Sequence, residues 1–260
     1  MGAVSLSVRA GPRGTALDGL RQDGSLKVVF PRTASRALQA VLVNTAGGIT
    51  GGDEFAIDAR AARGATLTLT TQAAERAYRA QPGETGRLTT RLAAEAGARL
   101  HWVPQETILF DGCALERLLR VDMSADARVM LAEPLIFGRA AMGERLRTGW
   151  FRDRIEVWRG GAPLLVDAMA LEGDMAGHLD RPHVADGAGA MVSLLYVAPD
   201  AAAHLDWVRA ALPDTGGVSL VRDTVLFLRA LAPDGFDLRA ILIPILHRLG
   251  GEALPRPWMI

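Results

Sequence analysis

Apolar and polar residues alternate along most of this chain in short segments. A period of two is typical of a strand that turns one face to a core and the other to solvent. In residues 150–158, for example, Phe151, Ile155 and Val157 fall on one face and charged residues fall on the other. The segments predicted as strands, after an opening strand near the N-terminus, are residues 26–30, 40–43, 54–58, 65–71, 88–92, 99–103, 118–123, 150–158, 164–166, 192–197, 218–221 and 225–231. The pattern therefore predicts a mainly β protein; a sandwich, a barrel and a solenoid all stay open, because no sequence repeat selects among them.

Helical spacing of apolar residues occurs only in the C-terminal third. One predicted helix begins after Asp200, which can cap its N-terminus, and ends before Pro213. The other covers residues 237–249 and ends at a Gly-Gly pair. Pro244 should kink or shorten it, because proline removes an N–H donor and clashes with the preceding turn. No low-complexity linker divides the chain, so we expect one domain over residues 1–260 with about two late helices.

The most distinctive loop is residues 44–53, which hold two Gly-Gly pairs and end in Asp53. The glycines are Gly47, Gly48, Gly51 and Gly52. Glycine adds no side chain to a core, so four of them indicate a backbone with positive φ or very close approach to a neighbour. Two interpretations stay open: a plain turn in which the aspartate bonds the backbone, or a functional site. No Gly-Lys-Ser/Thr follows and no clear G-x-G-x-x-G is present, so a nucleotide site is not expected.

Charge and cysteine content exclude several classes of protein. Lys+Arg and Asp+Glu are equal at 29 each, which argues against a nucleic-acid binder. Zero net charge and 49% hydrophobic residues favour association with a protein partner. The single cysteine, Cys113, rules out an internal disulfide framework and is expected to be a small buried residue. We find no signal peptide and no apolar run near the ~20 residues of a membrane span, so a cytoplasmic protein is expected.

Five longer motifs occur in order along the chain. They are residues 44–53, 70–79 (Thr-Thr-Gln-Ala-Ala-Glu-Arg-Ala-Tyr-Arg), 102–112 (Trp-Val-Pro-Gln-Glu-Thr-Ile-Leu-Phe-Asp-Gly), 138–144 (Gly-Arg-Ala-Ala-Met-Gly-Glu) and 255–258 (Pro-Arg-x-Trp). Together they resemble the UreD family of urease accessory proteins, called UreH in some lineages. The resemblance runs from about residue 24 to the C-terminus, and Ala46 stands where many members have proline.

The resemblance implies a fold, a function and partners. It implies a β-helix-like body with about two helices and no enzymatic activity. It implies a chaperone that is needed for nickel insertion into urease and that binds the urease apoprotein and a UreF-like protein, which in turn recruits a UreG-like GTPase. An internal tunnel would carry Ni²⁺, so nickel would be transient and no cofactor would be permanently bound. The family aspartate that matches Asp53 is associated with this tunnel.

Acidic residues near turns and strand ends are the candidates for an ion path. Carboxylates suit a transient route, because a few oxygen ligands bind a divalent cation without trapping it as thiolates would. The candidates are Asp53, Glu106, Asp111, Glu133 and Glu172. For each, solvation or pairing with an arginine is the alternative. A second candidate for a metal site is the loop with His178 and His183, for which ordinary loop polarity is the alternative.

From the residues alone, two other functions stay open. One is a hydrolase with a carboxylate pair such as Glu106 and Asp111, which would need two acids ~5–10 Å apart in a cleft. The other is a β-scaffold that binds partners and has no ion path. A cleft with two facing acids would favour the hydrolase, and a closed interior without a polar channel would favour the scaffold.

Overall fold

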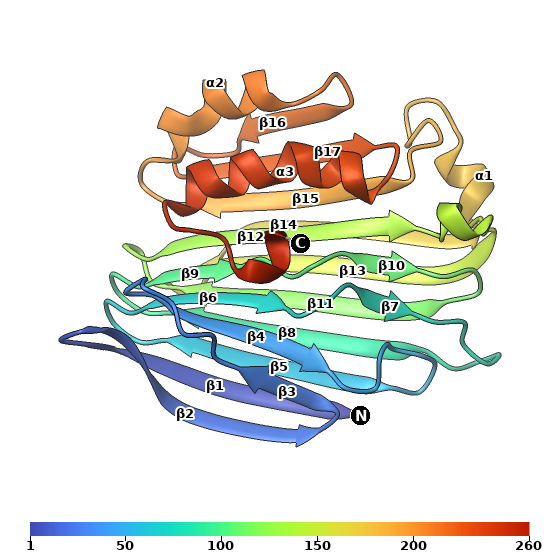
Figure 1. The fold of residues 1–260 in the computed structure, drawn as a ribbon. Coiled ribbons are helices and arrows are strands. Elements are labelled where there is room, and N and C mark those ends of the chain that lie inside the picture. Colours follow the sequence, from blue (N-terminus) through green and yellow to red (C-terminus); the bar gives the residue numbers. More distant parts are fainter. Residues whose placement is uncertain (260) are drawn as a thin grey trace.

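Two β-sheets lie face to face and enclose the larger hydrophobic core (Figure 1). This computed structural model describes residues 1–259. The first sheet has seven strands, which are β1 (Gly2–Gly11), β2 (Gly14–Gly24), β5 (Glu54–Ala61), β8 (Gly86–Ala94), β11 (Ala114–Met123), β13 (Thr148–Arg159) and β14 (Ala162–Asp174). The second sheet has ten, which are β3 (Leu26–Val29), β4 (Leu38–Asn44), β6 (Thr66–Thr71), β7 (Glu75–Ala77), β9 (Arg99–Trp102), β10 (Thr107–Leu109), β12 (Arg128–Phe137), β15 (Ala190–Val197), β16 (Gly216–Leu220) and β17 (Val225–Ala232).

The middle of each sheet is parallel and forms a solenoid. In the first sheet β5, β8, β11 and β13 pair in parallel, and in the second β4, β6, β9 and β12 do the same. The chain alternates between the sheets and so winds through about four turns of a β-solenoid. The predicted mainly β fold with a β-helix-like body is confirmed. A repeat is hard to see in the sequence because stacked positions are unequally spaced along the chain, as the column Glu54, Arg87, Glu116 and Arg152 shows.

Antiparallel strands extend the solenoid at both ends. β1 and β2 form a hairpin at one end, and β13 and β14, which are joined through Gly160 and Gly161, form a hairpin at the other. The second sheet continues from β12 through β15 and β17 to β16. The strand β12 was not predicted, and neither were β2, β7 and β10. In β12 both faces are buried, so polar and apolar residues do not alternate, and Pro134 breaks the usual signal of a central strand.

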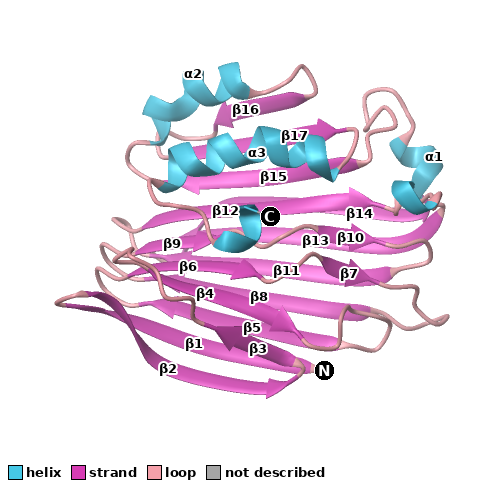
Figure 2. Ribbon diagram, in the orientation of Figure 1, coloured by secondary structure: helices cyan, strands magenta, loops and turns pink. Residues whose placement is uncertain are grey.

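The helices α2 (Ala201–Ala211) and α3 (Gly235–Gly250) cover the outer face of the second sheet (Figure 2). The short α1 (Met175–Leu179) follows β14 at the end of the sheets, and the 3-10 turns are η1 (Ala140–Met142) and η2 (Arg256–Met259). A second hydrophobic core lies between α2, α3 and the strands β12, β15 and β17, and it includes the fully buried Trp258. No helix of residues 1–259 is long and apolar enough to cross a membrane.

The helices differ from the prediction in the cap of α2 and in the length of α3. Asp200 precedes α2, but its carboxylate does not cap the helix; it binds Arg128 at 2.7 Å and accepts a hydrogen bond from the Tyr196 hydroxyl at 3.0 Å. Pro244 does not shorten α3, which runs to residue 250 and ends where Gly251 has a φ of 65°. Burial of one face of α3 against the sheet stabilises the helix through the proline.

Candidate functional site

Four of the five sequence motifs meet at one end of the solenoid, which we call the loop end. It comprises residues 44–53, 70–79, 102–112 and 138–144. Backbone bonds connect these segments: the Tyr78 amide donates to Ile49 at 2.7 Å, and the Gly138 amide donates to Leu109 at 2.8 Å. The motifs meet because equivalent loops of successive solenoid turns stack on one another.

The four glycines of residues 44–53 fulfil both roles expected of them. Gly47 and Gly52 have φ values of 79° and 78°, a region that favours glycine. At Gly48 an added Cβ would lie 2.2 Å from the Tyr78 ring, and at Gly51 it would lie 2.5 Å from a neighbouring side chain. The loop is therefore packed directly against the next motif, and larger residues would push the two apart.

Asp53 holds the end of this loop. Its Oδ2 accepts a hydrogen bond from the Thr50 amide at 3.0 Å, and its Oδ1 lies 3.5 Å from the N-terminal ammonium group. The side chain is 28% exposed, so solvent still reaches the carboxylate. Asn44 holds the start of the loop, because its side-chain oxygen accepts from the Ala46 amide at 3.0 Å. Asp53 thus has a structural role in the turn and keeps a charge near the surface of the loop end.

A cavity of about 290 Å³ lies between the two sheets behind these loops. The exposed residues Gly47, Gln72 and Ala73 line it where it reaches the surface. Deeper in, apolar side chains such as Phe55 and Ile57 alternate with polar ones from both sheets. The interior therefore holds a cavity with a mixed polar and apolar lining that opens at the loop end.

Three charged residues, which we call the inner cluster, line the deep part of the cavity: the buried Arg117 of β11 and Glu133 of β12, and the partly buried Asp153 of β13. Arg117 binds Asp153 with two nitrogens, Nε at 3.1 Å and Nη2 at 2.7 Å. Its Nη1 lies 2.8 Å from Glu133 and also donates to the Thr107 hydroxyl at 2.9 Å. The second oxygen of Glu133 accepts from the Trp102 indole N–H. One cation thus faces two carboxylates.

Burial changes the acidity of this cluster. It raises the pKa of Glu133, an effect that the positive charge of Arg117 opposes and the negative charge of Asp153 reinforces.

Arg117 and Asp153 were not among the predicted site residues, although the sequence held a signal for them. Asp153 lies between Phe151 and Ile155, so the alternation that buries those two also turns Asp153 inward. Arg117 is its partner in the register of β11 and β13. Opposite charges at matched inward positions of neighbouring strands indicate a buried ion pair, but the match is visible only once the strand pairing is known.

Glu75 of β7 lies nearer the opening of the cavity. Its two oxygens are each 3.2 Å from the Asn44 side-chain nitrogen, and Oε1 also accepts from the Arg76 amide at 3.1 Å. It takes part in no ion pair among residues 1–259. Burial raises the pKa of Glu75, and the charge of Asp53 adds to this effect. Sequence reasoning missed Glu75 as a site residue even though it lies within a motif.

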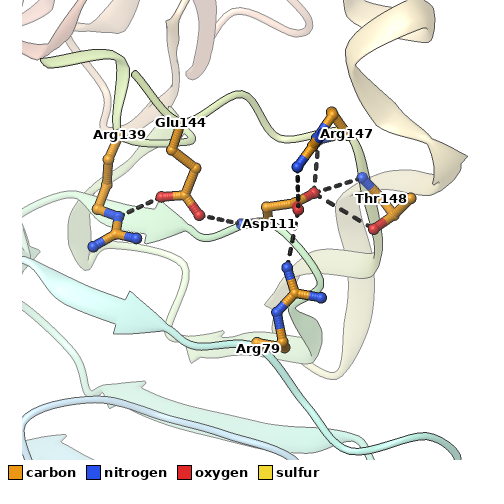
Figure 3. Close-up of polar contacts among 6 residues, drawn as sticks. All are labelled: Arg79, Asp111, Arg139, Glu144, Arg147 and Thr148. Carbon is orange, nitrogen blue, oxygen red and sulfur yellow. Dashed lines mark hydrogen bonds and ion pairs between the residues drawn. The ribbon is translucent and has the colours of Figure 1, made fainter. Parts of the chain in front are cut away.

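Asp111 and Glu144 are bound tightly to the loop end (Figure 3). Asp111 accepts hydrogen bonds from the amides of Arg147 and Thr148, both at 2.9 Å, and from Arg79 at 3.0 Å. Burial alone would raise the pKa of Asp111, but these amides and arginines hold it below its usual range. Glu144 accepts from the Asp111 amide at 2.9 Å. These carboxylates fasten the loops together.

The remaining candidates lie away from the cavity. Glu106 is buried and binds Arg239 of α3 at 2.6 Å, so it connects the second sheet to the helical layer. Glu172 is exposed on β14. His178 and His183 are exposed in α1 and the turn after it. Residues 1–259 contain no group of three or more His, Cys, Asp or Glu side chains that could hold a metal ion.

Cys113 is buried, as predicted for a small apolar residue. Burial raises the pKa of its thiol to about 12, so the group is a neutral thiol at neutral pH.

Comparison with known proteins decides the family. The family model described as UreD urease accessory protein matches residues 1–259. The chain belongs to the UreD family. The UreD protein of Roseobacter denitrificans is 50% identical over 260 residues, which is 100% of this chain and 95% of the relative. That of Ruegeria pomeroyi is 49% identical over 246 residues (95% and 96%), and that of Brucella suis is 41% identical over 263 residues (100% and 94%).

These matches confirm the resemblance found in the motifs. UreD-family proteins are non-enzymatic chaperones of urease maturation. The hydrolase alternative is set aside on the same ground. The geometry agrees, because Glu106 is bound to the guanidinium group of Arg239 and Asp111 to that of Arg79.

Proposed function

We propose that this UreD-family chain promotes nickel insertion into urease by giving Ni²⁺ a shielded route through the cavity between its sheets. The observation that supports this is the arrangement of carboxylates along the cavity, from Glu75 near the opening to Glu133 and Asp153 at depth. Nickel is the cargo of this route and is not kept permanently.

Transit, rather than storage, fits the chemistry of the lining. Carboxylate oxygens bind divalent cations, and each of these carboxylates already has partners within the protein. An entering ion therefore gains ligands only by displacing existing contacts, which limits how tightly it is held. Within this proposal Glu133 is an inner carboxylate of the route and Asp53 provides charge at the loop end. Glu106 and Asp111 hold the walls, and Glu172, His178 and His183 have no part in it.

We further propose that the chain acts in the cytoplasm in a complex with the urease apoprotein and a UreF-like protein, and through the latter with a UreG-like GTPase. Exposed apolar side chains on the helical layer support a protein partner: Phe236 is 82% exposed and Trp207 is 38% exposed. Zero net charge also favours association over solubility as a lone chain.

Filling the cavity tests the route. Thr90 of β8 lines the cavity and is 3% exposed, so Thr90→Phe should narrow the passage. Thr89, the next residue on the same strand, faces the opposite side of the sheet, and Thr89→Phe is the matched control. We expect the Thr90 variant to bind the urease apoprotein but to lower the nickel content of the matured urease, with the control unchanged. Normal nickel content with a correctly folded Thr90→Phe chain would refute the route.

A further inference from the structure

We propose that Arg117 is a built-in counter-cation that prevents Ni²⁺ from being retained at the inner cluster. This inference rests on the proposed nickel route and concerns its regulation. Glu133 and Asp153 lie within hydrogen-bond distance of one guanidinium group, at 2.8 and 2.7 Å. Two carboxylates that meet at one point of a cavity form the beginning of a divalent cation site. Arg117 occupies that point with its own positive charge.

Charge counting shows what the arginine does to an arriving ion. With all three groups ionised, the inner cluster carries one net negative charge, and without the guanidinium group it would carry two. The side chains of Arg117, Glu133 and Asp153 are only 5%, 8% and 11% exposed, so solvent screens these charges little. A dication at this point is attracted by the carboxylates and repelled by Arg117. It can therefore pass the cluster without being held as it would be by two free acids.

The contacts of Arg117 are unequal, which indicates how an ion would pass. The bond to Asp153 is bidentate and joins register partners on neighbouring strands. The bond to Glu133 uses Nη1 alone, and the same nitrogen also serves Thr107. Glu133 also belongs to the opposite sheet. Glu133 is therefore the carboxylate that Arg117 releases more easily, and the Arg117–Asp153 pair stays together while an ion interacts with Glu133.

A purely structural ion pair would have a different signature. In that case, losing Arg117 would destabilise the fold, because it leaves buried charges without a partner, but it would not change metal retention. Two variants separate these effects. Arg117→Gln exposes both acids to the cavity. Arg117→Gln combined with Asp153→Asn removes the bidentate pair as a unit, so the second variant stays informative if the first does not fold.

The control lies on the same strand. Arg120 of β11 is 38% exposed and pairs with Asp122 and Glu156 on the outside of the sheet, so Arg120→Gln makes the same change of charge away from the cavity. Glu133→Gln is a second control, because it keeps the arginine and removes the carboxylate that it releases.

The experiment loads each purified full chain with NiCl₂, measures the dissociation constant by calorimetry and counts the nickel kept after desalting. We expect Arg117→Gln to bind Ni²⁺ about tenfold more tightly than the unmodified chain, which corresponds to about 1.4 kcal/mol. The double variant is compared with Asp153→Asn, from which it differs only at Arg117, and should bind Ni²⁺ more tightly than that chain. The Arg120→Gln and Glu133→Gln chains should not gain affinity. Equal affinity of the two chains in either comparison, with both folded, would overturn the inference.

The cavity-filling variant keeps this test separate from that of the route. If Thr90→Phe blocks nickel insertion but the Arg117 variants bind Ni²⁺ no better, the route stands and the role of Arg117 fails. If the Arg117 variants bind Ni²⁺ tightly but Thr90→Phe leaves insertion normal, the route fails, and the counter-cation role falls with it because it presupposes passage.

Discussion

His101 makes the stability of this protein depend on pH in a way that can be worked out from the structure. It lies on β9, on the face of the second sheet that α3 covers, and is 6% exposed. Its Nδ1 is 3.5 Å from the Thr68 hydroxyl, and a Cβ added at Gly250 would lie 3.8 Å from the ring. Burial, reinforced by the charge of Arg99, lowers the pKa of His101 from 6.5 to about 4. The imidazole is therefore neutral in the folded protein at neutral pH.

The sign of the effect follows from proton binding. Between pH 6.5 and pH 4 the unfolded chain binds a proton at this histidine and the folded chain does not, so stability falls as the pH is lowered through this window. At 1.36 kcal/mol for each unit of pKa difference, the full loss is about 3 kcal/mol, of which about 2 kcal/mol is reached by pH 5. Above pH 6.5 the contribution is complete.

Replacing the imidazole isolates this contribution. His101→Gln keeps a group that can bond to Thr68 but cannot titrate, so its free energy of unfolding should fall less between pH 7 and pH 5, by about 2 kcal/mol. Urea unfolding at the two pH values measures this, and His183→Gln is the control because His183 is exposed. All other titrating groups are shared and cancel in the comparison. Equal pH dependence in the His101→Gln and unmodified chains would refute the reasoning.

Two further predictions concern the loop end. Asp53→Asn should fold and bind its partners, since asparagine can make the same turn contacts. It should lower the nickel content of urease, and Asp53→Glu should give an intermediate nickel content. Unchanged nickel content in Asp53→Asn would mean that Asp53 has only a structural role in the turn. Gly48→Ala should cost about 1–3 kcal/mol, because its Cβ would lie 2.2 Å from the Tyr78 ring. Gly217→Ala on β16, where an added Cβ meets nothing within 4 Å, is the control in thermal unfolding, and equal stability of these two variants would contradict the close approach.

Alternation of apolar and polar residues predicts those strands that have one solvent-exposed face. Alternation located β5, β8 and β13 because one side of the first sheet faces solvent. It failed at β12, where the helical layer buries the second face and Glu133 and Pro134 interrupt the apolar run. The burial of this second face depends on where α3 packs. That packing joins residues far apart in the chain, and the local sequence pattern does not reveal it.

The candidate site shows the same limit. Loop residues 44–53 could be recognised because paired glycines indicate a backbone with positive φ or close packing, and Asp53 directly follows the second pair. Arg117, Glu133 and Asp153 lie on three strands and become neighbours only through the winding of the solenoid. Glu106 and Asp111 looked alike in sequence as acids within one motif, yet one is bound to α3 and the other to the loop end.

The second sheet is a wall shared by two hydrophobic cores, and this shapes how the chain folds as it is synthesised. The solenoid turns leave the ribosome first. The outer faces of β12, β15 and β17 then stay uncovered until α3 (Gly235–Gly250) has been synthesised and packs against them. The cover is fastened still later by Trp258, whose indole N–H donates to the Val103 carbonyl at 2.9 Å. Until that bond forms, the nascent chain presents an apolar sheet to its surroundings, and such surfaces aggregate. This face of the sheet is therefore covered only when segments that follow it in the sequence have packed onto it.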